Sequence, residues 1–326
     1  MVDVIQEGDV KAIEDKTVAV IGYGAQGRAQ ALCMKDSGVN VIVGLREGGS
    51  SWNKVKEDGL EVHTVSEASK RADIIHILIP DEVQGDVYES EIKEHVTEGK
   101  TLSWSHGFNI VFKRIVPPEN VDVIMVAPKA PGTEERKRYV EGFGVPGLIS
   151  VRQDVSGKAR DTALAMAAAC GFTRAGVLDC TFEQETYEDL FGEQAVLCGG
   201  LAGLIKAGFE TLVDAGYPPE MAYFECLHEM KLIVDLIYEG GIANMWDVVS
   251  NTAEYGGRTR ADKIITEEVK NNMKTILKDV ESGKFAEEWI AEYKNGLPNL
   301  KKLREEEEKH PIETTGKEIR ALFKKK

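Results

Sequence analysis

"TVAVIGYGAQGRAQALCMKDSG", residues 17–38, joins a short β-branched run to a helical segment through a glycine-rich turn. The turn has the pattern G-x-G-x-x-G, which binds a dinucleotide when it lies between a strand and a helix. Gly22 permits the tight turn, Gly24 lets the backbone approach a pyrophosphate, and Gly27 allows close packing of helix on strand. The helix amino terminus adds amide donors and a favourable dipole. The predicted dinucleotide-binding loop comprises Gly22, Tyr23, Gly24, Ala25, Gln26 and Gly27.

Strand-like runs alternate with helical segments from this loop to about residue 181. The runs are "NVIVG", "DIIHILIP", "TLSWSHG", "DVIMVAP", "GLISVRQD" and "TRAGVLDC". This alternation predicts βαβ units and a parallel sheet covered on both faces. Beyond residue 181 the runs stop and helical periodicity takes over. We therefore expect an α/β Rossmann-type domain over residues 1–181 and an all-helical domain over residues 182–326.

Starts and stops are visible in the helical half. Pro218 and Pro219 are expected to begin one helix and Gly240 with Gly241 to end it, because proline suits the first helical turn and glycine the end. The charge-rich tail, residues 301–326, is expected to be a solvated helix end and a partly mobile terminus rather than a binding arm.

Composition excludes several classes of protein. A chain of 326 residues favours two domains over one core, and 42% hydrophobic with 29% charged residues is typical of a globular protein. The net charge of -15 would repel a phosphate backbone, so nucleic acid is not an expected partner. The five cysteines are odd in number and include no CxxC pair, which disfavours disulfide and zinc frameworks.

The amino terminus and the hydropathy pattern bear on location. The first ten residues carry acids where a signal peptide needs a basic start, and no run of about 18 apolar residues is evident. We therefore expect a cytoplasmic protein without a membrane segment.

The second predicted strand indicates which dinucleotide is bound. An NAD site usually places an acid after this strand to bind the ribose diol, whereas here Arg46 and the hydroxyls of Ser50 and Ser51 follow and suit a 2′-phosphate. This predicts a preference for NADP(H). Glu47 could instead accept hydrogen bonds from the diol, which keeps NADH use possible, and the two serines could instead cap a helix before Trp52.

The run "DIIHILIP" ends at Pro80 and is followed by Asp81, Glu82, Val83 and Gln84. Such a turn lies at the carboxyl edge of the sheet, where open α/β folds bind ligands. An acidic helix start that complements the helix dipole is the alternative interpretation.

His106 and Lys129 follow two further strands, and both are expected to point into the same crevice. His106 could be a catalytic group or a structural hydrogen-bonding residue. Lys129 could hold a carboxylate or tune protonation, or it could cap a helix or face solvent.

Two apolar helical stretches carry carboxylates four residues apart. "ETYEDLFGEQAVLCGG", residues 185–200, holds Asp189 and Glu193, and "YFECLHEMKLIVDLIY", residues 223–238, holds Glu225 and Glu229. Acids at this spacing repel, so each pair is solvated, salt-bridged or bound to metal. The apolar neighbours predict largely buried helices, where unpaired carboxylates are costly. Four carboxylates suit Mg²⁺, and two such ions could polarise a carbonyl and stabilise a developing alkoxide.

With "GYGAQG", "PDEVQG", "SHGF", "APKAPG", "DLFGEQAVLCGG" and "AGYPPEMAYFECLHE" in order, the chain resembles ketol-acid reductoisomerase, the acetohydroxy acid isomeroreductase of branched-chain amino-acid synthesis. The likeness spans residues 1–325, and the acidic blocks are its most specific part. A single helical domain resembles the short form. The resemblance implies a knotted helical domain intertwined with that of a second copy, in a homodimer or an assembly of dimers.

The resemblance also implies a two-step reaction in one site. Alkyl migration in 2-acetolactate or 2-aceto-2-hydroxybutyrate, both 2-hydroxy-3-oxo acids, would depend on two Mg²⁺ ions. NADPH would then reduce the rearranged 2-oxo acid to a 2,3-dihydroxy acid. Asp189 would bridge both ions and Glu193 would bind one of them. Glu225 and Glu229 would serve the other ion, with proton-relay work at Glu229.

Four further roles follow from the resemblance alone. His106 would be the catalytic histidine and Lys129 would support the metal site. Gly132 would approach the cofactor, and Ser250 would bind the substrate carboxylate.

Three positions depart from the family pattern, which often has serine at Ala25, histidine at Arg28 and serine at Gly49. These departures bear on the cofactor preference more than on the reaction.

Two other functions compete with the resemblance: a metal-free NADP-dependent hydroxy-acid dehydrogenase, whose acids are surface charges, and a dinucleotide sensor without catalysis.

Overall fold

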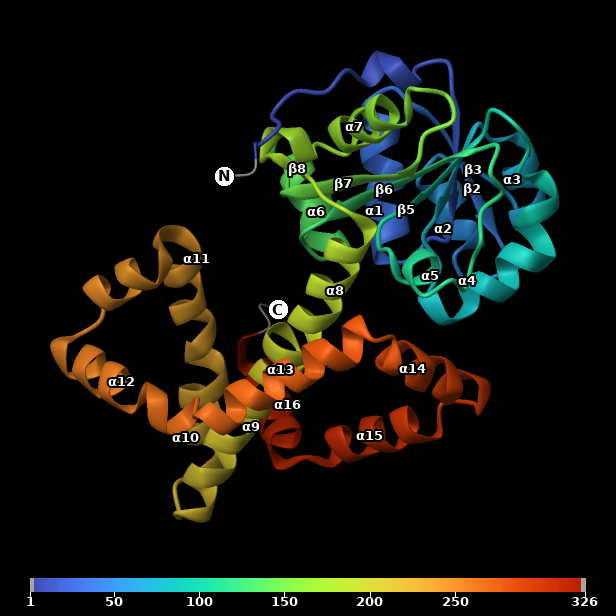
Figure 1. Cartoon of the computed structure of the whole chain (residues 1–326). Coiled ribbons are helices and arrows are strands. Elements are labelled where there is room, and N and C mark those ends of the chain that lie inside the picture. The colour runs from blue at the N-terminus through green and yellow to red at the C-terminus, as the bar shows by residue number, and fades with distance from the viewer. Residues whose placement is uncertain (1–2, 324–326) are drawn as a thin grey trace. The chain divides into compact units, whose positions relative to one another are not determined.

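The computed structural model describes residues 3–323 and divides into two compact units, one ending at Glu188 and the other beginning at Asp189 (Figure 1). We call them the nucleotide unit and the helical unit. The predicted domain boundary after residue 181 stays a prediction; the two compact units meet slightly later, inside a helix.

The nucleotide unit is built on one eight-stranded sheet with the order β3-β2-β1-β4-β5-β6-β7-β8. The strands are β1 (Thr17–Ile21), β2 (Asn40–Leu45), β3 (Glu61–Thr64), β4 (Ile74–Ile77), β5 (Thr101–Trp104), β6 (Asp122–Pro128), β7 (Gly147–Gln153) and β8 (Val177–Asp179). The seven predicted strand runs are all present, and β3 is additional. The chain moves outward in opposite directions from β1 and β4, so these neighbouring strands mark the switch point where open sheets bind ligands.

The prediction of a parallel sheet was wrong at one edge, because β7 runs antiparallel to β6 and β8 has the same direction as β7. The two strands join at their near ends, where Pro128 pairs with Gly147 and the Lys129 amide donates to the Pro146 carbonyl. The helix between them therefore does not cross the sheet, and the chain returns from the edge at which it left. All other strand pairs are parallel.

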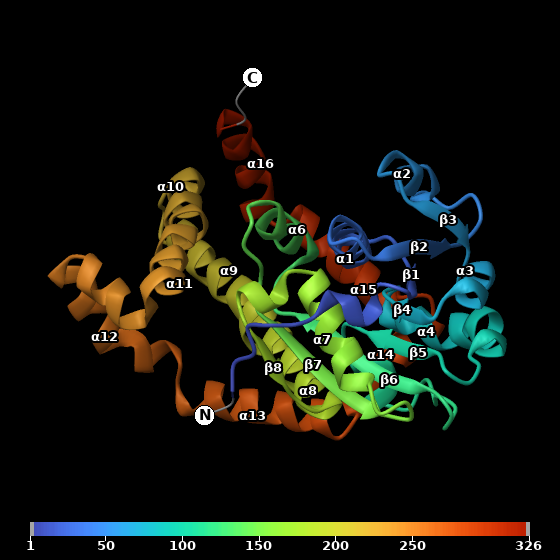
Figure 2. The same cartoon turned by 90° about the horizontal axis from the view of Figure 1, so that it is seen from above.

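Helices cover both faces of the sheet, as predicted. The helices of this unit are α1 (Ala25–Asp36), α2 (Trp52–Glu57), α3 (Val65–Arg71), α4 (Asp81–Val87), α5 (Phe108–Val111), α6 (Gly132–Val140) and α7 (Ala159–Ala169), and α8 (Phe182–Gly192) crosses into the helical unit. Along β1, Val18 and Val20 pack in one core and Ala19 and Ile21 in the other, which is the two-residue alternation of a strand. Figure 2 shows α1 and α3 on opposite sides of β1.

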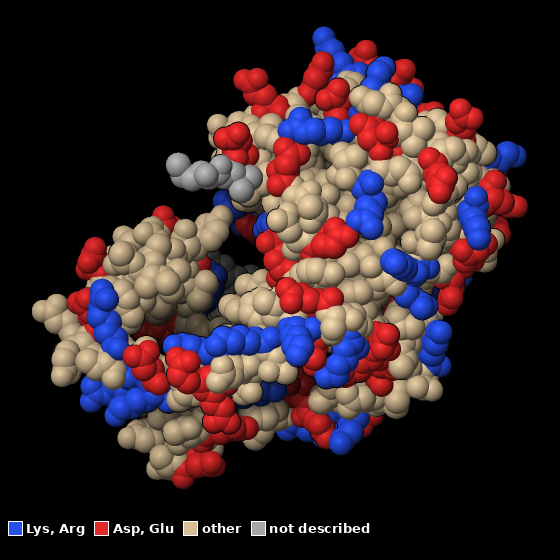
Figure 3. All heavy atoms as spheres, in the orientation of Figure 1, with Lys and Arg blue, Asp and Glu red and all other residues tan. Residues whose placement is uncertain are grey.

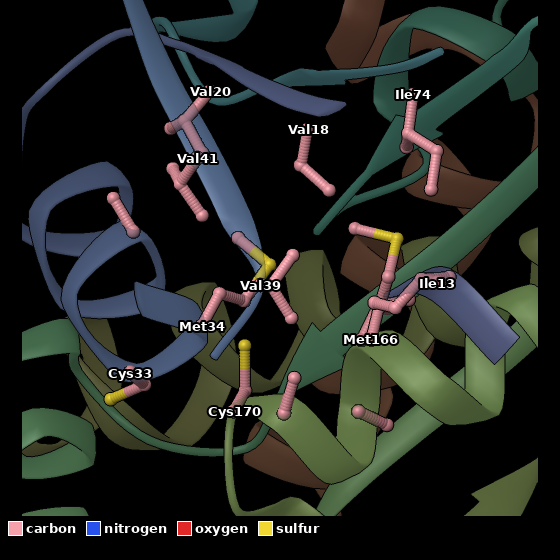
Figure 4. Close-up of a cluster of buried hydrophobic side chains, with 14 of the residues drawn as sticks. Ile13, Val18, Val20, Cys33, Met34, Val39, Val41, Ile74, Met166 and Cys170 are labelled. Atoms are coloured by element: carbon pink, nitrogen blue, oxygen red, sulfur yellow. The ribbon is translucent and has the colours of Figure 1, made fainter. Parts of the chain in front are cut away.

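The core on the α1 and α7 face is drawn in Figure 4. Met34 from α1 and Met166 with Cys170 from the α7 segment lie with Ile74 and Ile13 in this cluster. All of these side chains are buried, and burial of such apolar area is the main force that holds the helices on the sheet.

The helical unit continues from α8 through a π-helical segment, Glu193–Leu197. Its helices are α9 (Gly199–Asp214), α10 (Pro219–Tyr223), α11 (Glu229–Val248), α12 (Asn251–Ile264), α13 (Glu267–Glu281), α14 (Lys284–Lys294), α15 (Pro298–Lys309) and α16 (Pro311–Phe323). The predicted start at Pro218 and Pro219 is confirmed, since Pro218 is the amino-terminal cap of α10. Gly241 has a positive φ of 83° and interrupts regular helix geometry, although helical turns resume and reach Val248.

The charged tail is more ordered than expected. Its last helix, α16, buries Ile312 and Ile319 in a small core with Phe209, Ala222 and Tyr223. Only residues 324–326 of the predicted mobile terminus lie outside the described residues. The periodic isoleucines explain the difference, because an amphipathic helix can be charged over most of its surface and still be anchored by one apolar stripe.

Large apolar side chains of the helical unit are exposed in the single chain. They include Val196, Leu197, Leu204, Met221, Leu232, Val234, Tyr238, Ile242, Val248, Tyr255 and Ile264. In Figure 3 acidic and basic side chains are interspersed over much of the visible face, whereas the surface over α11 has few of them. Monomeric proteins rarely expose contiguous apolar areas of this kind, so the surface indicates an interaction site.

The expectation that no segment is long and apolar enough to span a membrane was too strict. The continuous helical stretch Phe182–Asp214 contains an 18-residue window with a mean hydropathy of 1.5 that passes this test by length and composition. Only 6% of the window is buried within the single chain.

Candidate active site

The glycine-rich loop has the geometry that the sequence predicts. Gly22 follows β1 with a φ of 107°, and a Cβ atom there would lie 2.7 Å from the Leu78 carbonyl oxygen, so only glycine fits. A Cβ on Gly27 would overlap the Gly22 carbonyl, which confirms the close packing of helix on turn. Gly24 is exposed at the amino terminus of α1, with open space where a Cβ would be. The loop therefore presents backbone amides to an anion.

Gly132, at the start of α6, lies directly against this loop. A Cβ atom on Gly132 would overlap the backbone of Ala25 and approach the Gln26 amide nitrogen at 2.7 Å. The side chain of Gln26 donates to the Ala130 carbonyl at 2.9 Å, which joins the same two segments. The strand end at β6 and the glycine-rich loop thus form one continuous surface at the carboxyl edge of the sheet.

The predicted 2′-phosphate contacts lie together beyond β2. Arg46 and Ser50 are exposed, and Gly49 closes a turn by donating to the Arg46 carbonyl at 3.0 Å. Ser51 occupies the cap position of α2, but its side chain makes no capping hydrogen bond there. The alternative of a serine helix cap therefore has no support at Ser51, and the roles of these residues in cofactor binding stay predictions.

Three side chains behind this turn form a cluster that the sequence analysis did not identify. Arg28 donates two hydrogen bonds to the Asp58 carboxylate, from Nε at 2.7 Å and from Nη2 at 2.9 Å, and the Tyr23 hydroxyl donates to the same group at 2.9 Å. The hydrogen bonds from Arg28 are the main cause that lowers the pKa of Asp58 to about 2. Burial, and then the neighbouring Asp58, raise the pKa of Tyr23. The cluster joins the glycine-rich loop to the end of α2.

The turn after β4 contributes residues of two kinds. Asp81 and Glu82 occupy the first turn of α4, which confirms the predicted acidic helix start. The Gln84 amide is engaged within the protein, because it donates to the Ile79 carbonyl at 2.8 Å and accepts from Trp104 Nε1 at 3.0 Å. Gln84 therefore holds the turn in place, while Asp81, Glu82 and Val83 are only partly buried at the carboxyl edge.

His106 meets a carboxylate that was not among the predicted site residues. Its Nδ1 lies 3.1 Å from Oε2 of Glu185, and the Gly107 amide donates to the same oxygen at 3.2 Å. Glu185 is 1% exposed, so this pair lies away from bulk water. A buried carboxylate that accepts from a histidine ring nitrogen fixes both the orientation of the ring and the location of its proton.

Lys129 completes this group. Its Nζ lies 3.4 Å from Oε1 of Glu185 and 3.3 Å from Oε1 of Glu188. Burial alone would raise the pKa of Glu185, but the hydrogen bond and charge of His106, the charge of Lys129 and the Gly107 amide together bring it below its usual value. Of the interpretations left open for Lys129, the structure supports the one in which this lysine binds a carboxylate. For His106, the structure shows a ring whose orientation is fixed by Glu185.

The acids of α8 continue the line begun by Glu185. Asp189 follows Glu185 by one turn of the same unbroken helix, and one carboxylate oxygen of each lies within 4.8 Å of the other. Glu193 follows after another turn, at the first residue of the π-helical segment. The acids at 185, 189 and 193 have one constant spacing, and this periodicity is the signal in the sequence that could have identified Glu185. π-Helical segments are rare and often occur at functional sites.

The other predicted acids do not form a buried cluster in the single chain. Glu225 lies within a second π-helical segment, Phe224–His228, and Glu229 directly follows it; both are exposed. The prediction that their helix is largely buried was wrong for the isolated chain, since Leu232 is 55% exposed. Among the described residues, no group of three metal-ligating side chains includes either acid. Ser250 is exposed and caps α12 by accepting from the Ala253 amide at 3.2 Å.

The fold and this cluster together define a class. A sheet whose switch point carries a glycine-rich loop, with an ionisable group at the neighbouring strand ends, is typical of oxidoreductases that use a nicotinamide dinucleotide.

Comparison with known proteins makes the identification specific. The description "Acetohydroxy acid isomeroreductase, NADPH-binding domain" matches residues 12–176, and "Ketol-acid reductoisomerase, C-terminal domain" matches residues 182–325. The chain belongs to the ketol-acid reductoisomerase family, whose members act in branched-chain amino-acid synthesis. The expectations of an oxidoreductase with a Rossmann-type domain and a helical domain are thereby confirmed.

Relatives of similar identity carry names with different cofactors. A protein of an uncultured archaeon, GZfos26G2, named ketol-acid reductoisomerase (NAD(+)), is 62% identical, with 98% of each chain covered. One from Akkermansia muciniphila, named ketol-acid reductoisomerase (NADP(+)), is 63% identical, with 99% of each covered. The solved structure of an NADH-preferring ketol-acid reductoisomerase from an uncultured archaeon has a TM-score of 0.97 at 60% identity and covers 99% of this chain and 100% of that one.

Proposed function

We propose that the group formed by His106, Glu185 and Lys129 belongs to the site that rearranges 2-acetolactate or 2-aceto-2-hydroxybutyrate and reduces the product. The observation that carries the proposal is Glu185, a buried carboxylate kept ionised by a histidine, a lysine and a backbone amide. Hydride transfer alone does not need this carboxylate or the row of acids that follows it. These carboxylates are needed if the site also catalyses a reaction in which negative charge develops on a substrate oxygen.

The carboxylates of α8 fit Mg²⁺. Oxygen ligands suit this ion, and Asp189 and Glu193 follow Glu185 along one helical stretch, in which Glu185 and Glu188 both pair with Lys129. Asp189 and Glu193 would hold metal, with Glu225 and Glu229 completing the set. Two bound Mg²⁺ ions would polarise the substrate carbonyl and stabilise the alkoxide that develops during alkyl migration.

The chain's own groups then have distinct tasks. Glu185 accepts from Nδ1 of His106 and keeps the proton on that atom, so the ring can give or take a proton at Nε2. Lys129 and the Gly107 amide hold Glu185 ionised in this position. Glu229 is proposed as a proton relay and Ser250 as the contact for the substrate carboxylate.

The glycine-rich loop and Gly132 are proposed to cradle the pyrophosphate, and Arg46, Ser50 and Ser51 to contact a 2′-phosphate. Asp81, Glu82, Val83 and Gln84 would line the same cofactor cleft. The bound dinucleotide supplies the hydride for the second step. We propose NADP(H) as the preferred cofactor with NADH also used, because Glu47 stands beside Arg46 in the exposed turn.

The direct test measures NADPH or NADH oxidation with 2-acetolactate, with and without Mg²⁺. We expect turnover that requires Mg²⁺, and loss of turnover in Asp189→Asn with unchanged dinucleotide binding. Glu183→Gln is the control, since Glu183 is a surface acid of α8 that pairs with Arg152. Turnover that survives a chelator would favour the metal-free dehydrogenase, and no turnover by the wild-type protein would favour the sensor.

A second copy of the chain is proposed to cover the apolar surface of the helical unit. Leu232, Tyr238 and Ile242 of α11 are more than half exposed, and the adjoining Glu225 and Glu229 find no metal-ligating group among the described residues of one chain. A partner that buries this surface would bring additional acids close to them. We therefore propose a homodimer whose metal sites take residues from both copies, and a cytoplasmic enzyme rather than a membrane protein.

Complementation tests this arrangement directly. Asp189→Asn and Glu229→Gln are each expected to be inactive as pure proteins. In a co-expressed mixture, a heterodimer with shared sites has one site free of both substitutions, so activity should reappear. If each site uses acids from one chain only, every site carries one defect and the mixture stays inactive.

A further inference from the structure

Three polar side chains lie inside the nucleotide unit where apolar packing would be expected. Gln30 on α1, His76 on β4 and Ser103 on β5 are each 0% exposed. A buried polar group is costly unless it is hydrogen-bonded, so these residues form a network or destabilise the fold. The established site residues do not account for them.

Both ring nitrogens of His76, the central residue of the network, have hydrogen-bond partners. His76 and Ser103 are paired in register across β4 and β5, and Nδ1 of His76 lies 2.9 Å from the Ser103 hydroxyl oxygen. Nε2 of His76 lies 2.8 Å from Oε1 of Gln30. Because an amide oxygen can only accept, Nε2 carries the proton and Nδ1 accepts from Ser103. Burial lowers the pKa of His76 to about 4, so the ring is neutral and this pattern is fixed.

Gln30 leads from this centre toward both parts of the site. Its Nε2 lies 2.9 Å from the Ser105 hydroxyl oxygen and 3.3 Å from Oε1 of Gln26. Ser105 immediately precedes His106, and Gln26 belongs to the glycine-rich loop, where it also bonds the Ala130 carbonyl. One amide, anchored from behind by His76, therefore holds the cofactor loop and the end of β5 at the same time.

We propose that Gln30 is a positioning residue that sets the glycine-rich loop and the His106 segment in one fixed relation, so that the dinucleotide and His106 stay aligned for hydride transfer. This inference rests on the proposed function. Backbone loops at a sheet edge are otherwise free to shift by fractions of an ångström, and transfer between two bound groups is sensitive to such shifts. A network that only stabilised the fold would not need to end at these two segments.

Gln30→Met tests the inference, because methionine has a similar volume and cannot form these hydrogen bonds. We expect kcat for reduction of the rearranged 2-oxo acid to fall about 10- to 100-fold, the range associated with small misplacement of reacting groups. The dissociation constant for NADPH should stay within about threefold, because the pyrophosphate cradle is backbone. The primary isotope effect measured with NADPH deuterated at the transferred position should rise, since hydride transfer becomes slower relative to other steps.

Asp122→Asn is the matched control for loss of stability. Asp122 is buried at the start of β6, at the opposite edge of the sheet, and accepts from the Val155 and Ser156 amides at 2.8 Å and 3.0 Å. We expect a lower melting temperature with unchanged kcat and isotope effect. If Gln30→Met behaves in the same way as this control, the network is only structural and the inference is wrong.

Ser105→Ala provides a second test that does not disturb the core, because Ser105 is partly exposed and His76 keeps both partners. It should reproduce part of the kinetic effect, and its combination with Gln30→Met should be less than additive. A wild-type kcat and isotope effect in Ser105→Ala would overturn the inference. Failure of the proposed function looks different, since the wild-type protein would then not turn over the substrate at all.

Discussion

The two units differ in how completely one chain satisfies its own groups. In the nucleotide unit His76, Glu185 and Asp58 all have partners within the chain, and the sheet has two filled cores. In the helical unit Glu225 and Glu229 are exposed among exposed apolar side chains. The difference agrees with the proposal that one chain supplies the cofactor site, whereas a second copy completes the metal site.

The largest expected effect comes from Glu185→Gln. The amide cannot hold the proton on Nδ1 of His106 in the same way, so turnover should fall by about 10²-fold or more, while dinucleotide binding stays unchanged. Steady-state kinetics and NADPH fluorescence titration measure the two quantities. Glu183→Gln, a surface acid of the same helix that pairs with Arg152, should leave both unchanged. Normal turnover in Glu185→Gln would limit the role of the nucleotide unit to cofactor binding.

Leu232→Glu tests whether a second copy covers the α11 surface of the helical unit. A charge on the α11 surface would be buried without a partner in the proposed dimer, and we expect the dimer dissociation constant to rise about 30-fold or more. Sedimentation velocity over a concentration series measures this constant. Lys302→Gln, which breaks a surface pair with Glu306 on α15, is the control. A monomeric wild-type protein with full activity would contradict the idea that the helical unit is incomplete.

Glu135 provides a test of completeness inside the nucleotide unit, because it is a buried polar group whose two carboxylate oxygens have no hydrogen-bond partner. Burial raises its pKa to about 8. Between the ordinary value and 8 the unfolded chain releases the proton and the folded chain keeps it, so stability falls as pH rises through this window, by up to about 1.4 kcal/mol per pH unit.

Glu135→Gln should remove this dependence. Its melting temperature should differ little from wild type at pH 5 and exceed it increasingly up to pH 8, with no further gain above that pH. A constant difference at all pH values would mean that Glu135 is not protonated in the folded protein.

The smallest effect is expected at Arg28. Arg28→Met removes two hydrogen bonds to Asp58 and should raise KM for NADPH and NADH by about threefold, with kcat unchanged, since a partly exposed ion pair contributes on the order of 1 kcal/mol. Lys93→Met, which breaks the surface pair with Glu89, should change neither constant. An equal result for the two variants would remove the Tyr23, Arg28 and Asp58 cluster from the account of the cofactor site.

The fold was largely predictable because its signals are local. The strand runs and the glycine-rich turn each specify their own backbone, and the helix start at Pro218 does the same. The direction of β7 was not predictable, since it depends on whether the connection through α6 crosses the sheet. β3 was missed because "EVHT" is a short run with one strongly apolar residue.

Where spacing or strand ends carry the information, the sequence selected residues that the structure brings near Glu185, namely His106, Lys129 and Asp189, and their roles stay predictions. Glu185 was missed although it continues the same four-residue spacing, because its partners come from 79 and 56 residues away. The burial of Glu225 and Glu229 was overestimated for a physical reason: apolar neighbours predict burial of a surface but do not say whether the same chain or another copy covers it.

The tight backbone contact between Gly132 and Ala25 does not tolerate substitution, whereas the exposed turn at Arg46 does. A side chain at Gly132 would displace the glycine-rich loop, the proposed cradle for the pyrophosphate, whereas the exposed turn after β2 can exchange residues without disturbing the sheet. Binding of a dinucleotide and the preference for one dinucleotide over the other therefore depend on different segments and can change independently. If Arg46, Ser50 and Ser51 hold the 2′-phosphate as proposed, a few surface substitutions there would change the cofactor preference, and relatives of nearly equal identity are named for NAD(+) and for NADP(+).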